Sequence, residues 1–157
     1  GAIQVRGDNV FAGYWRQPDK TREEFTADGY FRTGDIGLVD RDGYVAIVGR
    51  AKDLIITGGY NVYPREIELA IDALPGVVES AVVGVPHPDF GEAVTAALVL
   101  RKDAALDAET VIAELRKNIA NYKLPKSVYF VDDLPRNAMG KVQKAVLREQ
   151  FGAAGKK

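Results

Sequence analysis

One lysine near the end of the chain stands in a setting suited to chemistry on an anion. The segment Leu134–Lys141 reads Leu-Pro-Arg-Asn-Ala-Met-Gly-Lys, so Lys141 follows a glycine in a polar turn without regular apolar spacing. Turns rich in Pro, Asn and Gly are usually surface connections. A long cationic side chain held there can reach a phosphate or a developing oxyanion supplied by another part of the protein. We therefore predict that Lys141 is a catalytic residue.

Composition limits the function classes that need be considered. The 157 residues are 46% hydrophobic and 27% charged, which is typical of a soluble globular protein that can form a core. A net charge of −1, from 21 basic and 22 acidic residues, gives no basic excess for nucleic acid or an anionic membrane, and we expect neither as a partner. The absence of cysteine excludes disulfides and thiol chemistry by the protein itself and fits a cytoplasmic location.

The first third of the chain is expected to be β-rich. Residues 2–6 alternate like a strand, and a short helix is expected over 18–25 because proline stands in its first turn. Strands at 36–39 and 44–48 flank an Asp-Gly turn, which predicts a hairpin. Tyr14 and Trp15 are expected to pack in this region. Its apolar content is modest, so it would struggle to fold alone.

From Asp53 onward the pattern alternates between strands and helices, which predicts an α+β fold with a central sheet flanked by helices. Strands are expected at 54–57, 77–85, 93–100 and 128–131. The second and third of these are apolar on both faces, so we expect them to be central strands. Helices are expected from Pro64 and from an N-cap at Asp107, and a last helix carries Val142, Val146, Leu147 and Phe151.

A domain boundary is expected at Arg50–Asp53, where charge is dense and few apolar contacts would cross. The segment Gly1–Val5 lacks an initiating Met and reads as the middle of a strand, so we expect the chain to be a fragment.

Three further motifs, in the right order, connect these features to a family. They are Tyr30-Phe31-Arg32-Thr33-Gly34-Asp35, then Gly49-Arg50-Ala51-Lys52-Asp53, then Gly58-Gly59-Tyr60-Asn61-Val62-Tyr63-Pro64. Together with Val83–Glu92 and the Gly140-Lys141 turn they resemble the successive C-terminal signatures of adenylate-forming enzymes. That superfamily includes acyl-CoA synthetases, peptide-synthetase adenylation domains and luciferases. The segments 56–64 and 131–137 are most similar to malonyl-CoA synthetases.

The resemblance implies a two-step reaction. A small carboxylic acid attacks the α-phosphate of Mg-ATP to give an acyl-adenylate and pyrophosphate. The small C-terminal domain then rotates, and the thiol of CoA displaces AMP. Residues 1–51 would end the large domain and residues 52–157 would form the small one. The large N-terminal domain would hold most of the Mg²⁺ contacts, so we expect this fragment to be inactive alone.

The resemblance also assigns roles to single residues. Asp35 matches the aspartate that binds the ribose hydroxyls, since a carboxylate can accept two hydrogen bonds from a diol. Arg50 matches an arginine that contacts the nucleotide, and Lys52 occupies the hinge position. The alternatives without a functional role are a turn-forming Asp35 after Gly34, a solvated Arg50 and an exposed Lys52.

Further positions concern CoA and the phosphates. Gly58, Gly59 and Tyr60 would line the pantetheine channel, and glycine permits a close approach to the backbone. Asn61 falls where relatives place a polar residue near the nucleotide phosphate. The alternative for the glycines is a plain strand-ending turn. Glu66 and Glu68 are interpreted as structural residues at a helix start, and the single histidine, His87, as a surface turn residue.

Lys141 also has an alternative without a catalytic role, namely a solvated lysine at a helix start. A cation there is disfavoured by the helix dipole, which favours a role elsewhere. Met139 replaces the Ser or Thr that the family pattern often has before Gly-Lys, which puts a phosphate contact from that position in doubt. No protein ligand set for a metal is expected.

Two other functions stay open. The chain could be an excised domain that acts as a binding module or as the substrate of a protein lysine acetyltransferase and deacetylase, because acetylation removes the charge of a lysine such as Lys141. It could also belong to an adenylation domain that loads a carrier protein. The acyl chain is not readable from these residues.

Overall fold

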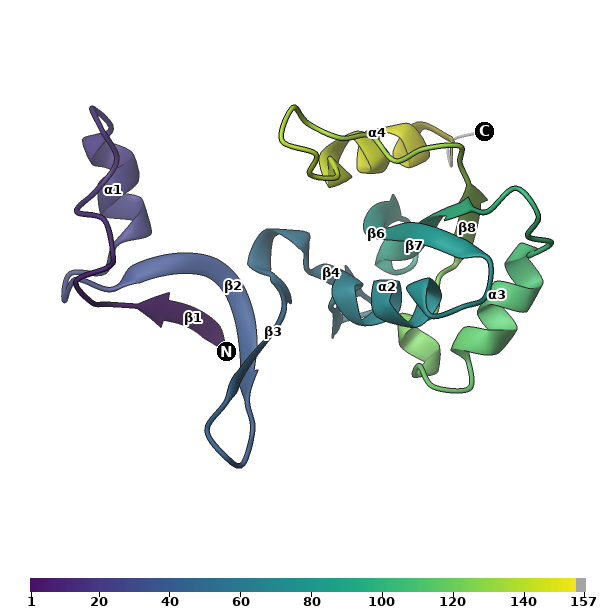
Figure 1. The fold of residues 1–157 in the computed structure, drawn as a ribbon, viewed down its shortest axis with the longest axis horizontal. Coiled ribbons are helices and arrows are strands. Elements are labelled where there is room, and N and C mark those ends of the chain that lie inside the picture. Colours follow the sequence, from purple (N-terminus) through teal and green to yellow (C-terminus); the bar gives the residue numbers. More distant parts are fainter. Residues whose placement is uncertain (155–157) are drawn as a thin grey trace. The chain divides into compact units, whose positions relative to one another are not determined.

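The computed structural model describes residues 1–154, which form two compact units (Figure 1). Unit 1 is Gly1–Lys52, and unit 2 begins at Asp53. None of the helices in the described residues combines the length and the apolarity needed to cross a bilayer.

Unit 1 is a three-stranded antiparallel sheet with one short helix. The strand order is β1 (Ala2–Val5), β2 (Phe31–Val39), β3 (Val45–Arg50), and α1 (Pro18–Glu24) begins at its proline. The expected hairpin is therefore present as β2–β3. The strand prediction at 36–39 was too short, because β2 begins at Phe31 and pairs with β1 through its first half.

Aromatic side chains, and few aliphatic ones, hold unit 1 together. The Phe11 ring makes edge contacts with the rings of Tyr14, Phe25 and Phe31 at centroid distances of 5.1 to 5.5 Å. Tyr14 packs as expected, but the expectation for Trp15 is wrong because its side chain is 82% exposed. Every buried hydrophobic residue among the described residues lies in unit 2.

Unit 2 is built on a five-stranded sheet. Its strands run in the order β5 (Tyr60–Val62), β4 (Ile55–Thr57), β7 (Gly91–Leu100), β6 (Val77–His87), with β8 (Ser127–Phe130) parallel to β7. β7 is central, as predicted. The same prediction for β6 is wrong: among the described strands it pairs only with β7, and helices cover its two faces.

The helices of unit 2 lie on both faces of this sheet (Figure 1). They are α2 (Pro64–Asp72), α3 (Ala108–Leu115) and α4 (Lys144–Ala154), with 3-10 turns η1 (Ala51–Asp53) at the boundary of the units and η2 (Asn121–Lys123) before β8. Asp107 is the N-cap of α3, as predicted, and its carboxylate accepts a 2.7 Å hydrogen bond from the Thr110 amide. Hydrogen bonding from the Thr110 side chain, and then from this amide, lowers the pKa of Asp107.

Strand alternation divides the core into two layers. On one face Val82 packs with residues of α2 and α3, including Ile67 and Val111. On the other face Val83 packs with Leu147 and other residues of α4. The predicted α+β fold, a central sheet flanked by helices, is confirmed.

Candidate functional site

In unit 1, Asp35 and Arg50 face each other across the β2–β3 ladder. They are cross-strand partners, and the Arg50 Nε lies 2.9 Å from the Asp35 Oδ1. The Asp35 side chain is 18% exposed and that of Arg50 55%. Since Asp35 lies within a strand, the alternative of a turn-forming residue is wrong. The pair places a carboxylate acceptor beside guanidinium donors on one face of the sheet, a combination that can bind a polyhydroxyl or phosphate group.

Lys52 lies in the short link between the units. Arg50 ends β3, whereas the Asp53 carboxylate accepts a 2.8 Å hydrogen bond from the Arg148 guanidinium of α4. Ala51 and Lys52 therefore have exposed side chains between a residue fixed on unit 1 and a residue fixed on unit 2. Backbone torsions at these two positions can change without breaking either contact.

Gly58 and Gly59 form the two-residue turn of the β4–β5 hairpin, which we call the glycine turn. Thr57 pairs with Tyr60 across it, and the two glycines have φ of 55° and 81°. Positive φ at both central positions is the geometry of a tight hairpin turn that favours glycine. A Cβ on Gly59 would have no neighbour within 4 Å, so the backbone there is open to an incoming chain.

The residues after the glycine turn point to different sides. The exposed Tyr60 ring packs on the Tyr122 ring of η2, with centroids 4.7 Å apart. Asn61 is exposed and pairs with Ile56, on the opposite face of β5 from Tyr60 and the buried Val62. Tyr60 therefore belongs to an aromatic surface beside the glycine turn, and Asn61 does not.

Lys141 lies in a hairpin-like turn, which we call the lysine hairpin (Arg136–Val142). An isolated bridge between Arg136 and Val142 closes it. Asn137 organises its interior: the Asn137 Oδ1 accepts hydrogen bonds from the amides of Met139 and Lys141 at 3.0 and 2.9 Å. Gly140 has φ of 76°. The Lys141 side chain is exposed, and no carboxylate of residues 1–154 forms an ion pair with it.

The helix after this hairpin begins later than the sequence predicted. α4 starts at Lys144, so Val142 is not helical and Lys141 is not at a helix start. The argument from the helix dipole therefore does not apply to Lys141, because that effect is confined to the first turn. Lys144 occupies that turn instead, and its ammonium lies 2.5 Å from the carboxylate of Glu68.

Glu68 is more than a residue of a helix start. Its carboxylate is 8% exposed and also accepts a 2.9 Å hydrogen bond from the Val82 amide, so it joins α2, β6 and α4. Glu66 has a comparable bond: both of its carboxylate oxygens accept from the Lys123 ammonium at 2.7 Å. This hydrogen bond raises the pKa of Lys123, against the effect of burial.

The glycine turn and the lysine hairpin lie at opposite ends of β6. The Arg136 guanidinium contacts Glu79 near the start of β6. The Gly58 amide donates a 2.9 Å hydrogen bond to the Phe90 carbonyl, just beyond His87 at the end of β6. The eight-residue rise from 79 to 87 corresponds to about 27 Å of strand. The two candidate segments of unit 2 therefore lie at separate ends, and Asn61 lies at the end opposite Lys141.

Several contacts could not be found in the sequence. Arg136 and Glu79, like Lys144 and Glu68, are far apart in the chain, and no local signal links them. No group of three or more metal-ligating His, Cys, Asp or Glu side chains occurs in residues 1–154.

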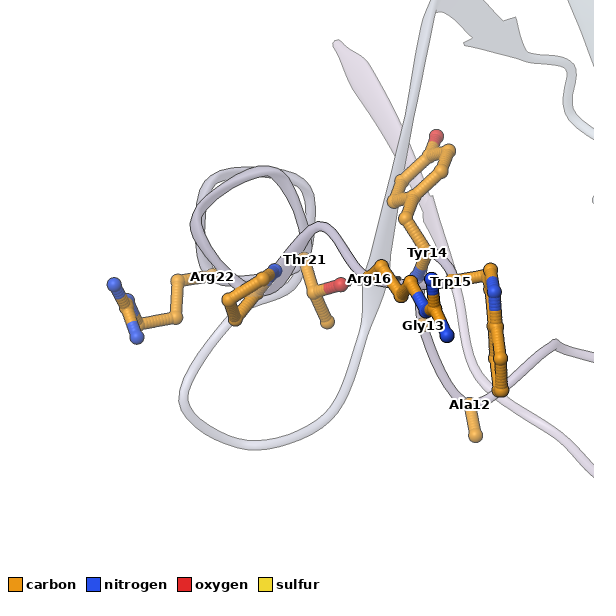
Figure 2. Close-up of a pocket in the computed structure, with 8 residues that line it drawn as sticks. Ala12, Gly13, Tyr14, Trp15, Arg16, Thr21 and Arg22 are labelled. Atoms are coloured by element: carbon orange, nitrogen blue, oxygen red, sulfur yellow. Dashed lines mark hydrogen bonds between the residues drawn. The ribbon is translucent and has the colours of Figure 1, made fainter.

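A surface pocket of about 530 Å³ lies elsewhere in unit 1, between the turn at 12–16 and the first turns of α1. Figure 2 shows Tyr14, Trp15 and Arg16 on one side of it and Thr21 and Arg22 of α1 on the other. None of the candidate site residues predicted from the sequence lines this pocket.

Comparison with known proteins identifies the family of this chain. Residues 66–141 match the family described as AMP-binding enzyme C-terminal domain. The structure of ATP-bound MatB from Rhodopseudomonas palustris is 61% identical, with a TM-score of 0.92 over 99% of this chain and 31% of that one. Apo MatB from the same organism, 62% identical over the same shares, gives a TM-score of 0.75.

A sulfoacetate–CoA ligase from Cupriavidus necator is 48% identical over 94% of this chain and 29% of its own length. The chain thus spans about three tenths of the proteins it matches. On these similarities, the chain belongs to the adenylate-forming superfamily and carries its AMP-binding enzyme C-terminal domain.

Proposed function

We propose that this chain is the C-terminal portion of an AMP-forming acyl-CoA synthetase. The observation that carries the proposal is the placement of the glycine turn and the lysine hairpin at opposite ends of β6. One end can serve adenylate formation and the other can serve thioester formation, provided that the domain turns between the two steps.

In the first step a carboxylate oxygen attacks the α-phosphorus of ATP, and the bond to pyrophosphate breaks. Two anions must approach each other, and their charge is lowered by the ammonium of Lys141. The hairpin holds the lysine backbone while leaving the side chain without an internal partner. Asp35 binds the ribose hydroxyls, and Arg50 orients Asp35 through their 2.9 Å contact while its outer nitrogens reach the nucleotide.

In the second step unit 2 turns about Ala51–Lys52, so that Lys141 leaves and the glycine turn arrives. The CoA sulfur attacks the adenylate carbonyl, the carbon–oxygen bond to AMP breaks, and the thiol proton passes to solvent. The open backbone at Gly59 and the ring of Tyr60 line the path of the pantetheine arm. Because Asn61 lies at this end, its proposed contact with the nucleotide belongs to the second step.

The remaining parts of the enzyme are proposed to lie outside this chain. Unit 1 would end the large domain, whose other segments would hold the acyl pocket and Mg²⁺. The acyl substrate is proposed to be malonate or methylmalonate, supported by the likeness of segments 56–64 and 131–137 to malonyl-CoA synthetases. We place the enzyme in the cytoplasm, consistent with its lack of cysteine.

Lys141→Ala in the full-length enzyme tests the proposal. Adenylate formation, followed as pyrophosphate exchange, should fall by about 10²- to 10³-fold. Thioester formation from supplied acyl-adenylate should persist. Equal loss in both half-reactions would contradict the role of Lys141. The 157-residue chain alone should form no thioester from ATP, CoA and malonate.

The exposure of Lys141 favours a second role, as the substrate of a protein lysine acetyltransferase and deacetylase. Acetylation would remove the ammonium charge and stop the first step only. Mass spectrometry of the native protein should find Lys141 acetylated under some growth conditions. An unmodified Lys141 under every condition would count against this role.

A further inference from the structure

The guanidinium of Arg136 makes two contacts that converge on the lysine hairpin. Its Nη1 donates a 2.7 Å hydrogen bond to the carbonyl of Gly140, the residue before Lys141. Its Nη2 donates to the carboxylate of Glu79 on β6. One planar group thus joins the two sides of the hairpin and attaches them to the sheet.

Other contacts hold the remainder of the hairpin. The Asn137 side chain fixes the backbone inside the turn, and the Gln143 amide donates a 2.7 Å hydrogen bond to the Pro135 carbonyl at its base. The Lys144–Glu68 pair anchors the start of α4 below it. The contact of Arg136 with Glu79 attaches the polar side of the hairpin to β6, and Val142 at the end of the hairpin packs against the apolar cluster that contains Val83.

We propose that Arg136 and Glu79 are positioning residues that place Lys141 for the adenylation step. This inference rests on the proposed function of Lys141. The two side chains are 39% and 29% exposed, and ion pairs at that exposure contribute little to global stability. Their effect is therefore on placement: a hairpin free to shift by an ångström would carry the ammonium out of register with the reacting phosphate.

The test is Glu79→Gln in the full-length enzyme, which keeps the side-chain shape and removes the charge. Adenylate formation, measured by pyrophosphate exchange, should fall by about tenfold through kcat. Thioester formation from supplied acyl-adenylate and the melting temperature should be unchanged. Arg136→Gln should lower the rate of adenylate formation at least as much. The double variant should be no slower than Arg136→Gln alone, because the two groups act as a unit.

A matched control is Glu114→Gln, which removes the exposed ion pair between Glu114 of α3 and Lys117 in the turn after it, and which should alter neither half-reaction. Hydrogen exchange of peptides covering 136–143 should be faster in Glu79→Gln than in the control. Unchanged hydrogen exchange of these peptides together with an unchanged rate of adenylate formation would overturn the inference. Equal loss in both half-reactions would overturn it as well.

The two proposals fail in different ways. If Lys141→Ala keeps its adenylation activity, the proposed function itself is wrong. If Lys141→Ala loses adenylation while Glu79→Gln retains it in full, only the positioning role is wrong.

Discussion

The two units differ in how they hold their functional groups. Unit 2 has a core on both faces of its sheet, and its charged side chains are fixed by contacts between elements far apart in the chain. Unit 1 has no buried hydrophobic side chain among its residues, and its Asp35–Arg50 pair is set by one local hairpin. The β2–β3 hairpin of unit 1 exposes large apolar side chains, including Leu38 and Ile47.

This difference is what the proposed function requires of the two units. A unit that must move as a rigid body needs its own core, because its functional ends have to keep their spacing during the motion. A unit that contributes a few groups to a larger domain can rely on that domain for burial. The exposed apolar face of unit 1 is the kind of surface that a larger domain would bury.

The largest expected effect on stability distinguishes the buried core of unit 2 from the exposed apolar face of unit 1. Leu98→Ala should destabilise the 157-residue chain by about 3 kcal/mol, because Leu98 is fully buried in unit 2. Leu38→Ala should change stability by less than about 0.5 kcal/mol, since its side chain is 62% exposed. Urea unfolding of the two variants measures both. Similar losses would break the contrast between the units.

A smaller effect is expected from the ion pair beneath the lysine hairpin. Lys144→Met would remove the nearer of the two cations beside the buried Glu68 carboxylate and leave Arg65 at 4.0 Å. It should cost about 2 kcal/mol, less than a fully buried pair costs, because Arg65 remains and Lys144 is 20% exposed. Lys117→Met, which breaks an exposed pair at the C-terminal end of α3, should cost less than about 0.5 kcal/mol. Equal costs would show that Glu68 is not held as described.

The smallest expected effect is a pH dependence at the other end of unit 2. The hydrogen bond from Lys123 to Glu66 raises the pKa of Lys123 above 10.5. The folded state therefore holds this proton more tightly than the unfolded state does. The stabilisation is complete below the unfolded pKa and is lost as pH rises through the folded value.

The melting temperature should consequently fall more steeply above pH 10 in the wild type than in Glu66→Gln, in which the partner is neutral. Parallel profiles would exclude this linkage.

The same contrast governs what could be predicted from the sequence. The sheet, the β2–β3 hairpin and the Asp107 cap follow from local patterns, because periodicity and turn chemistry act over a few residues. The late start of α4 was missed because Val142 has helical spacing from Val146, while its backbone is engaged with Arg136. Apolarity on both faces made β6 read as central, although its burial comes from helices and not from a second strand.

Candidate site residues were accessible from motifs, but their supports were not. Asp35, Arg50, the glycine turn and Lys141 all stand in short recognisable segments. The partners that hold the lysine hairpin come from β6 and α2, 57 and 76 residues away in the chain. A single sequence contains no signal for such pairings, because every carboxylate in it is an equally plausible ion-pair partner.

The central claim is that opposite ends of unit 2 serve different chemical steps, and paired half-reaction assays of two full-length variants test it most directly. Lys141→Ala should lose about 10²- to 10³-fold in adenylate formation and keep thioester formation. Gly59→Asn should show the reverse pattern, because asparagine tolerates the left-handed backbone at this position and places a side chain in the open space beside the glycine turn. If each variant impaired both steps alike, the assignment of one end to each step would be contradicted.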